Sequence, residues 1–112
     1  MNIQKMMKEA QKMQAKLQED MQRAQDKLGE ERLEGSAGGG MVTVTVTGHK
    51  QVVSVKIDPK AVDPNDVETL EDLVFAATSS ALAAADAKSE EVMGEVRGGM
   101  NIPGLDLGSF GL

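Results

Sequence analysis

Residues 41–47, MVTVTVT, alternate strictly between apolar and hydroxyl-bearing side chains. Successive side chains of a β-strand point to opposite faces, so this run predicts a strand with one valine face and one threonine face. A helix would scatter the same valines around its circumference, because its period is 3.6 residues. The alternation therefore requires a sheet, with Val42, Val44 and Val46 on its buried face.

A second run, QVVSVKID at residues 51–58, predicts the next strand. Its apolar face is expected to consist of Val53, Val55 and Ile57. The intervening Gly48 and His49 predict a tight type II′ hairpin, because glycine suits the first central position of that turn. ERLEGSA at residues 31–37 predicts a weaker first strand, which completes a three-stranded antiparallel sheet with one buried face.

Four glycines fall within residues 35–40, just before the alternating run. A phosphate-binding loop needs a strand before it and a helix N-terminus after it, because the helix supplies free N–H groups and a positive dipole end. Here a strand follows, and no Lys-Ser/Thr pair occupies the required offset. The glycines are therefore expected to turn the chain rather than to bind phosphate.

Residues 3–28 predict one long helix, because apolar side chains recur every three or four positions without an interrupting glycine or proline. Asn2 is the expected N-cap, and Gly29 is expected at the position after the C-cap. At about 100° per residue the side chains separate into apolar, glutamine-rich and basic arcs. The methionines of the apolar arc suit either an adaptable partner groove or ordinary packing, and the helical spacing favours packing. They are Met6, Met7, Met13 and Met21.

The basic arc has six members: Lys5, Lys8, Lys12, Lys16, Arg23 and Lys27. Lysines near a helix N-terminus oppose the helix dipole, and lysines four residues apart repel one another, so the arrangement opposes helix stability slightly. Lys8 to Lys27 spans about 28 Å, close to one turn of duplex DNA. Two interpretations remain open: a solvated basic face, or a surface that binds phosphates with little base readout.

Residues 67–96 predict a second long helix, after Asp-Pro pairs at 58–59 and 63–64 that resemble cap-and-proline starts. Phe75, Leu82 and Met93 widen its apolar face to an arc of about 200°. So wide an arc exceeds what one small sheet can cover. We therefore expect this helix to pack on the sheet and on a second subunit.

The 112 residues suit one domain, which we place at residues 1–97, followed by a Gly-rich tail at 98–112. The net charge is −6, but residues 1–28 carry +2 and residues 61–112 carry −8. Without cysteine, and with His49 as the only histidine, the chain offers no catalytic set, and we expect no enzyme activity, cofactor, metal or small-molecule substrate. The N-terminus lacks a signal-peptide pattern and no apolar run is long enough for a membrane span, so a cytoplasmic protein without membrane contact is expected.

The order of several segments resembles the YbaB/EbfC family of bacterial nucleoid-associated proteins. These segments are NIQKMMKEAQKMQAKLQ, LEGSAGGGMVTVTVTG, VSVKIDP, LEDLVFAA and the final GGM…PGL. The resemblance implies an α+β fold of helix, three strands and helix, a tweezer-like homodimer, and binding of double-stranded DNA in the nucleoid. It also adds two candidate contacts from the last helix, Lys88 and Arg97, although residues 83–87, AAADA, lack the basic residues that family members often carry there.

The leading hypothesis is a non-enzymatic, homodimeric protein that binds duplex DNA mainly through phosphates, organises or protects the nucleoid and influences gene expression. The alternative is a protein-interaction module, either a prefoldin-like chaperone or an adaptor for recombination or replication proteins. In that case the methionines and the tail residues Ile102, Leu105 and Phe110 would contact partners.

Overall fold

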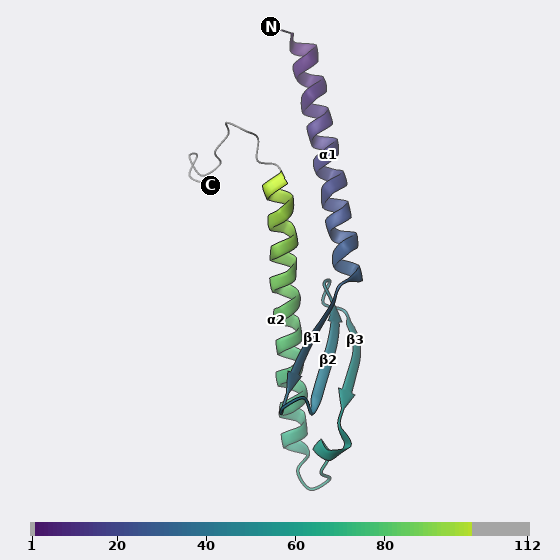
Figure 1. Ribbon diagram of the computed structural model, residues 1–112, viewed down its shortest axis with the longest axis vertical. Helices are drawn as coiled ribbons and strands as arrows, with labels where there is room; N and C mark the ends of the chain where they lie inside the picture. The colour runs from purple at the N-terminus through teal and green to yellow at the C-terminus, as the bar shows by residue number, and fades with distance from the viewer. Residues whose placement is uncertain (1, 100–112) are drawn as a thin grey trace, which may run out of the picture.

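The computed structural model describes residues 2–99 and shows two long helices and a three-stranded sheet (Figure 1). The elements, in chain order, are α1 (Ile3–Glu30), β1 (Arg32–Ala37), β2 (Val42–Thr47), β3 (Val52–Ile57), the short 3-10 helix η1 (Pro59–Ala61) and α2 (Val67–Gly99). The predicted α+β class and element order are confirmed. Gly98 and Gly99 continue α2, and the rest of the predicted tail lies outside the described residues.

The sheet is antiparallel with the order β1-β2-β3, and α2 packs against β1 and β2. Val44 of β2 pairs with Gly35 of β1 on one side and with Val55 of β3 on the other. The valine face of β2 is completely buried, as its alternation predicts. Its partners in this core are the small residues of α2, Ala77, Ala81 and Ala85.

Gly35 allows α2 to lie directly on the backbone of β1. A Cβ atom at this position would lie 2.3 Å from the carbonyl oxygen of Ala77 and 2.2 Å from the backbone nitrogen of Ala81. No side chain fits in that space. Glycine on the strand and alanines on the helix therefore act together to set the distance between α2 and the sheet.

The third strand departs from the prediction, because its apolar side chains are exposed. Val55 is 47% exposed and Ile57 is 40% exposed, although they pair with the buried Val44 and Val42. They lie on the correct face of the sheet, but α2 does not reach far enough across it to cover β3. An irregularity in the pairing also places Val52, rather than the predicted Val53, beside Val46.

The β2–β3 turn is not the predicted type II′ turn. Its left-handed residue is Lys50, with φ of 66°, whereas Gly48 has no positive φ. The backbone N–H of Lys50 donates to the carbonyl oxygen of Thr47 at 2.9 Å, as in a three-residue loop that ends in a left-handed residue. Gly48 is needed for a different reason: its N–H donates to the carbonyl oxygen of Leu28 at 2.9 Å, which joins the hairpin to the end of α1.

The glycine run turns the chain, as predicted, and connects β1 to β2. Gly38, Gly39 and Gly40 all adopt left-handed backbone conformations, with φ between 65° and 91°. Three consecutive residues of this kind are accessible to glycine and are rare for any other residue type. Gly29, by contrast, does not follow the helix as expected: α1 continues to Glu30, and the extended Glu31 is its C-cap.

Capping side chains begin the helices, as the sequence suggests. Asn2 accepts a hydrogen bond from the backbone N–H of Lys5 at 3.3 Å and so caps α1. Asp58 accepts from the N–H of Lys60 and begins η1. Asp66, rather than the predicted Asp63-Pro64 pair, binds the first turn of α2.

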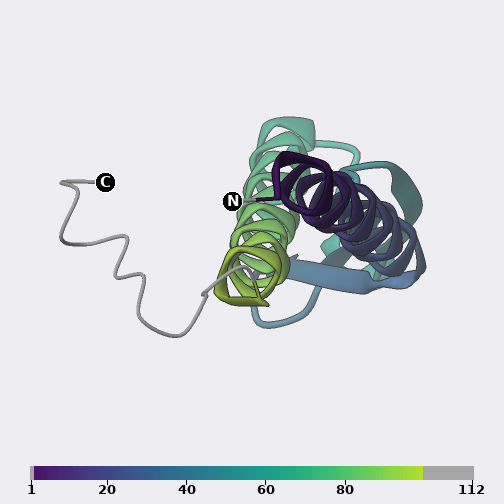
Figure 2. The same cartoon turned by 90° about the horizontal axis from the view of Figure 1, so that it is seen from above.

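Most of α1 extends away from the rest of the fold (Figures 1 and 2). Only its last turns contact α2, where Ala24 and Leu28 are buried against Val92 and Val96, and every residue from 3 to 16 is exposed. The molecule is 78 Å long with a radius of gyration of 21.5 Å, whereas a compact 100-residue domain has a radius near 13 Å. Within residues 2–99, no segment covers Met6, Met7 and Met13, so the predicted packing of the α1 methionines stays a prediction.

No helix within residues 2–99 is both long enough and apolar enough to cross a membrane.

Candidate nucleic-acid interface

A row of four lysines occupies the extending part of α1: Lys5, Lys8, Lys12 and Lys16. All four are exposed. Their spacing of three or four residues places them on one side of the helix over about 17 Å. None of them forms an ion pair with any residue between 2 and 99. We call these four residues the lysine row.

The lysine row is separate from the apolar side of α1. At 100° per residue, the centres of the two arcs are about 140° apart. The only carboxylate between residues 3 and 18 is Glu9. A polyanion can therefore approach the row without contact with the apolar side chains and with little repulsion from nearby acids.

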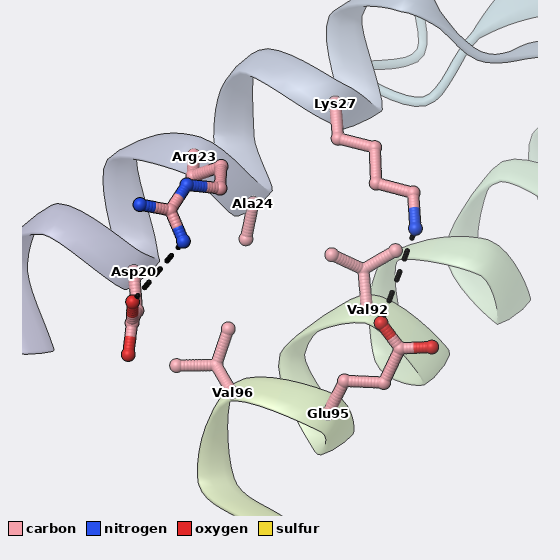
Figure 3. A pocket seen from close by; sticks show the side chains of 7 residues that line it. All are labelled: Asp20, Arg23, Ala24, Lys27, Val92, Glu95 and Val96. Carbon is pink, nitrogen blue, oxygen red and sulfur yellow. Dashed lines mark ion pairs between the residues drawn. The ribbon is translucent and has the colours of Figure 1, made fainter. Parts of the chain in front are cut away.

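The other two basic residues of α1 are neutralised within the chain (Figure 3). Arg23 lies 3.4 Å from a carboxylate oxygen of Glu19 and 3.6 Å from one of Asp20. The ammonium of Lys27 lies 4.0 Å from a carboxylate oxygen of Glu95 on α2. Exposed pairs of this kind add little stability, but they do cancel the local positive charge.

These ion pairs border a cleft between α1 and α2 with a volume of about 250 Å³. Its apolar floor is formed by Ala24, Val92 and Val96, whose side chains point toward one another in Figure 3. The cleft is thus the open margin of the small contact that joins the two helices.

The two candidates from α2 lie apart from the lysine row. Lys88 is only 24% exposed and lies 3.7 Å from carboxylate oxygens of both Glu31 and Glu91. This pair joins α2 to the end of α1, so Lys88 has a structural role. Arg97 is exposed in the last turn of α2, where a cation interacts favourably with the helix dipole.

The sequence does not identify Glu95 and Glu31 as ion-pair partners of Lys27 and Lys88. Both partners are distant in the sequence and meet because α1 and α2 pack antiparallel. The sequence does contain one indication of these ion pairs. Ala24 and Leu28 on α1 have the same four-residue spacing as Val92 and Val96 on α2, against which they pack. Placing these apolar positions against one another brings Lys27 close to Glu95 and Lys88 close to Glu31.

The described residues do not form a catalytic or metal-binding constellation. His49 is exposed in the β2–β3 turn, and no group of three histidine, aspartate or glutamate side chains within residues 2–99 is placed to hold a metal ion. The chemistry that the surface does offer is a set of fixed positive charges at regular spacing.

The fold and the lysine row together define a small α+β protein with an extended cationic helix suited to a polyanion. The chain belongs to the YbaB/EbfC DNA-binding family, whose sequence model matches residues 1–100. This match confirms the family resemblance and spans every element of the fold.

Relatives named as nucleoid-associated proteins support the same assignment. One from Alkaliphilus metalliredigens is 50% identical over 104 residues, which cover 93% of this chain and 88% of the relative. Another from Bacillus cereus is 54% identical over 85 residues, covering 76% and 78%. A crystal structure of an uncharacterized Helicobacter pylori protein superposes with a TM-score of 0.68 over 77% of this chain and 90% of the other. At 17% identity this last likeness concerns the fold alone.

Proposed function

We propose that this protein binds double-stranded DNA without catalysing a reaction, through the phosphates that face its lysine row. Membership of a DNA-binding family supports the ligand. The names of its relatives support a role at the nucleoid, and hence a cytoplasmic location.

The observation that carries the proposal is the unpaired state of the lysine row among the described residues. A side chain already held by a carboxylate must break that pair before it can bind a phosphate, and these four need not. Their span of about 17 Å equals the axial rise of about five base pairs of duplex DNA. Contacts to phosphates alone read little sequence, so binding is expected to be largely non-specific.

The remaining basic candidates rank below the lysine row. Arg23 and Lys27 lie on the same helix, but each has a carboxylate partner. Arg97 lies on the other helix, has no ion pair within residues 2–99 and can add a peripheral contact. Lys88 contributes to the fold, and we assign it no DNA contact of its own.

We further propose that the protein acts as a homodimer formed through the exposed apolar side chains of β3. The apolar surface of β3 continues the buried face of β2 and has no cover within residues 2–99. Phe75 of α2, 74% exposed, adds to it. Asp86 of α2 pairs with Lys50 of the β2–β3 turn. Phe75 lies three helical turns before Asp86 and therefore on the same side of α2. The side of α2 that carries Phe75 thus faces toward β3.

A duplex-binding titration at several salt concentrations tests the proposal. Four phosphate contacts in each protomer predict a slope of log K against log salt near −3.6, or about −7 for a dimer. The variant Lys8→Gln/Lys12→Gln should bind unrelated duplexes about 10-fold more weakly at low salt and flatten the slope by about 2 per protomer.

The matched control is Lys56→Gln/Lys60→Gln, which changes the net charge equally but lies at the end of β3 and in η1, away from α1. This control should retain nearly full affinity. Equal losses in the two variants would mean that net charge acts rather than the lysine row. No binding by the parent protein would exclude DNA as the ligand and favour the protein-interaction module.

A further inference from the structure

The apolar side of the extending part of α1 has no cover among residues 2–99. Ile3, Met6, Met7 and Met13 are each 55–66% exposed, and they continue the same side of the helix that is buried at Ala24 and Leu28. An isolated amphipathic helix of this length is marginally stable in water, because most helical stability comes from packing of the apolar face. Repulsion between the lysines of the lysine row lowers the stability of this part of α1 further. We call this surface, from Ile3 to Leu17, the methionine stripe.

The end of α2 lies where the methionine stripe begins. Val96 borders the same cleft as Asp20 and Ala24, and the two helices run antiparallel. Three residues further along α2, Gly99 is therefore level with about Met21 of α1, one turn before Leu17. Figure 1 shows α1 continuing past this point while α2 does not. The chain after Gly99 thus starts at one end of the stripe.

The sequence after Gly99 has the length and composition to cover the methionine stripe. Residues 100–112, MNIPGLDLGSFGL, can extend over about 43 Å, whereas Leu17 and Ile3 are only about 21 Å apart. The segment contains Asp106 and no Lys or Arg, which suits the cationic α1. Six of its residues are large and apolar: Met100, Ile102, Leu105, Leu107, Phe110 and Leu112.

We infer that residues 100–112 pack along the methionine stripe of their own chain and brace α1. A tethered segment has an effective concentration in the millimolar range, which favours it over a separate molecule. The apolar surface that we assign to a second copy lies instead on β3, at the other end of the molecule. Because the lysine row is about 140° around the helix, the bound segment leaves the lysines free for phosphate. It supports the DNA-binding helix without competing for its ligand.

A spin label on the segment gives a direct test, because the chain has no native cysteine. The full-length variant Ser109→Cys carries the label, and the methyl groups of the methionines are ¹³C-labelled for NMR. The signals of Met6, Met7 and Met13 should lose more than half of their intensity, while that of Met41, at the opposite end of β2, should be unaffected. A label at Lys60→Cys is the matched control and should spare all three α1 methionines. Full intensity of these signals with the Ser109→Cys label would overturn the inference.

A mixed sample separates the same chain from a second copy. Spin-labelled chains without ¹³C are combined with ¹³C-labelled chains without the spin label, under conditions of subunit exchange. Broadening should disappear in the mixture. Persistent broadening would show that the segment of another chain covers the stripe and would overturn the same-chain assignment.

Hydrogen exchange measures the bracing effect on the intact chain. In Leu105→Ser/Phe110→Ser the amides of residues 5–16 should exchange at least 10-fold faster than in the parent, whereas Ser109→Ala should leave them unchanged. Unchanged exchange in the double variant would contradict the bracing role. The duplex titration with the lysine variants is independent of both readouts, so failure of this inference leaves the DNA proposal standing.

Discussion

A Cβ atom added to Gly48 would lie 2.5 Å from the carbonyl oxygen of Leu28. The N–H of Gly48 donates to that same oxygen at 2.9 Å, and Leu28 is 1% exposed. The tip of the β2–β3 hairpin therefore packs directly on the last turns of α1. This contact, together with the helix–helix contact at Ala24, positions α1 on the sheet.

Gly48→Ala should lower the free energy of unfolding by about 2 kcal/mol, because the added methyl group forces the hairpin away from α1. Urea denaturation measures this loss. Gly98→Ala is the control: within residues 2–99, no atom beyond its chain neighbours and its own helical backbone lies within 4 Å of its Cβ position, and its φ is not positive, so alanine should be neutral or slightly stabilising. Equal stability of the Gly48→Ala variant and the parent would show that this contact is not needed.

Release of Arg23 from its carboxylates should strengthen DNA binding. In Glu19→Gln/Asp20→Asn the guanidinium loses both ion-pair partners and becomes available to a phosphate. We expect several-fold tighter duplex binding and a salt slope steeper by about 1 per protomer. Glu71→Gln/Asp72→Asn makes the same charge change near the start of α2 and should have a smaller effect. If both variants gain equally, relief of general repulsion is sufficient to explain the result.

Val55→Asp should prevent dimer formation, because it places a carboxylate within the apolar surface of β3. Sedimentation at micromolar concentration should detect monomer for this variant and dimer for the parent. Lys56→Asp, whose side chain lies on the opposite face of the same strand, should remain dimeric. A dimeric Val55→Asp variant would place the interface elsewhere.

The carboxylate of Asp66 should make the stability of α2 depend on pH in the acid range. Hydrogen bonds from the hydroxyl of Thr69, at 2.7 Å, and from its backbone N–H, at 3.3 Å, lower the pKa of Asp66 below its ordinary value of 3.8. The stabilisation is thus complete above the unfolded-state pKa and is lost as the pH falls through the lower folded-state value.

Asp66→Asn retains an acceptor for the cap but does not titrate. Between pH about 4.5 and about 2.5, its unfolding free energy should therefore fall less steeply than that of the parent. Parallel denaturation curves across this range would mean that the Asp66–Thr69 hydrogen bonds do not contribute to folding.

Local patterns in the sequence predict most of the secondary structure. Strict alternation identifies β2 and its buried valines, uninterrupted helical spacing identifies α1, and Asn2 caps that helix as predicted. These features depend on neighbouring residues, which the sequence displays directly. The exposed lysine row is predictable for the same reason, because residues spaced three or four positions apart lie on the same side of any α-helix.

Features that depend on contacts between distant elements could not be predicted in this way. The apolar face of β3 is correctly oriented but exposed, because only the position of α2 decides which strands are covered. Gly48 looks like a turn residue, whereas its main constraint comes from Leu28 on another element. Similarly, the acid that neutralises Lys27 lies 68 residues further along the chain and becomes visible only when α1 and α2 are packed together.

Because α1 is buried only near its C-terminal end, a small rotation there produces a large displacement at its N-terminal end. It is attached near Ala24, and Lys5 lies about 29 Å further along its axis. A tilt of about 10° at the attachment would move Lys5 by about 5 Å, which is a large part of the width of a DNA groove. If the lysine row contacts DNA as proposed, small adjustments at a few alanine and valine contacts would match its position to duplexes of different curvature.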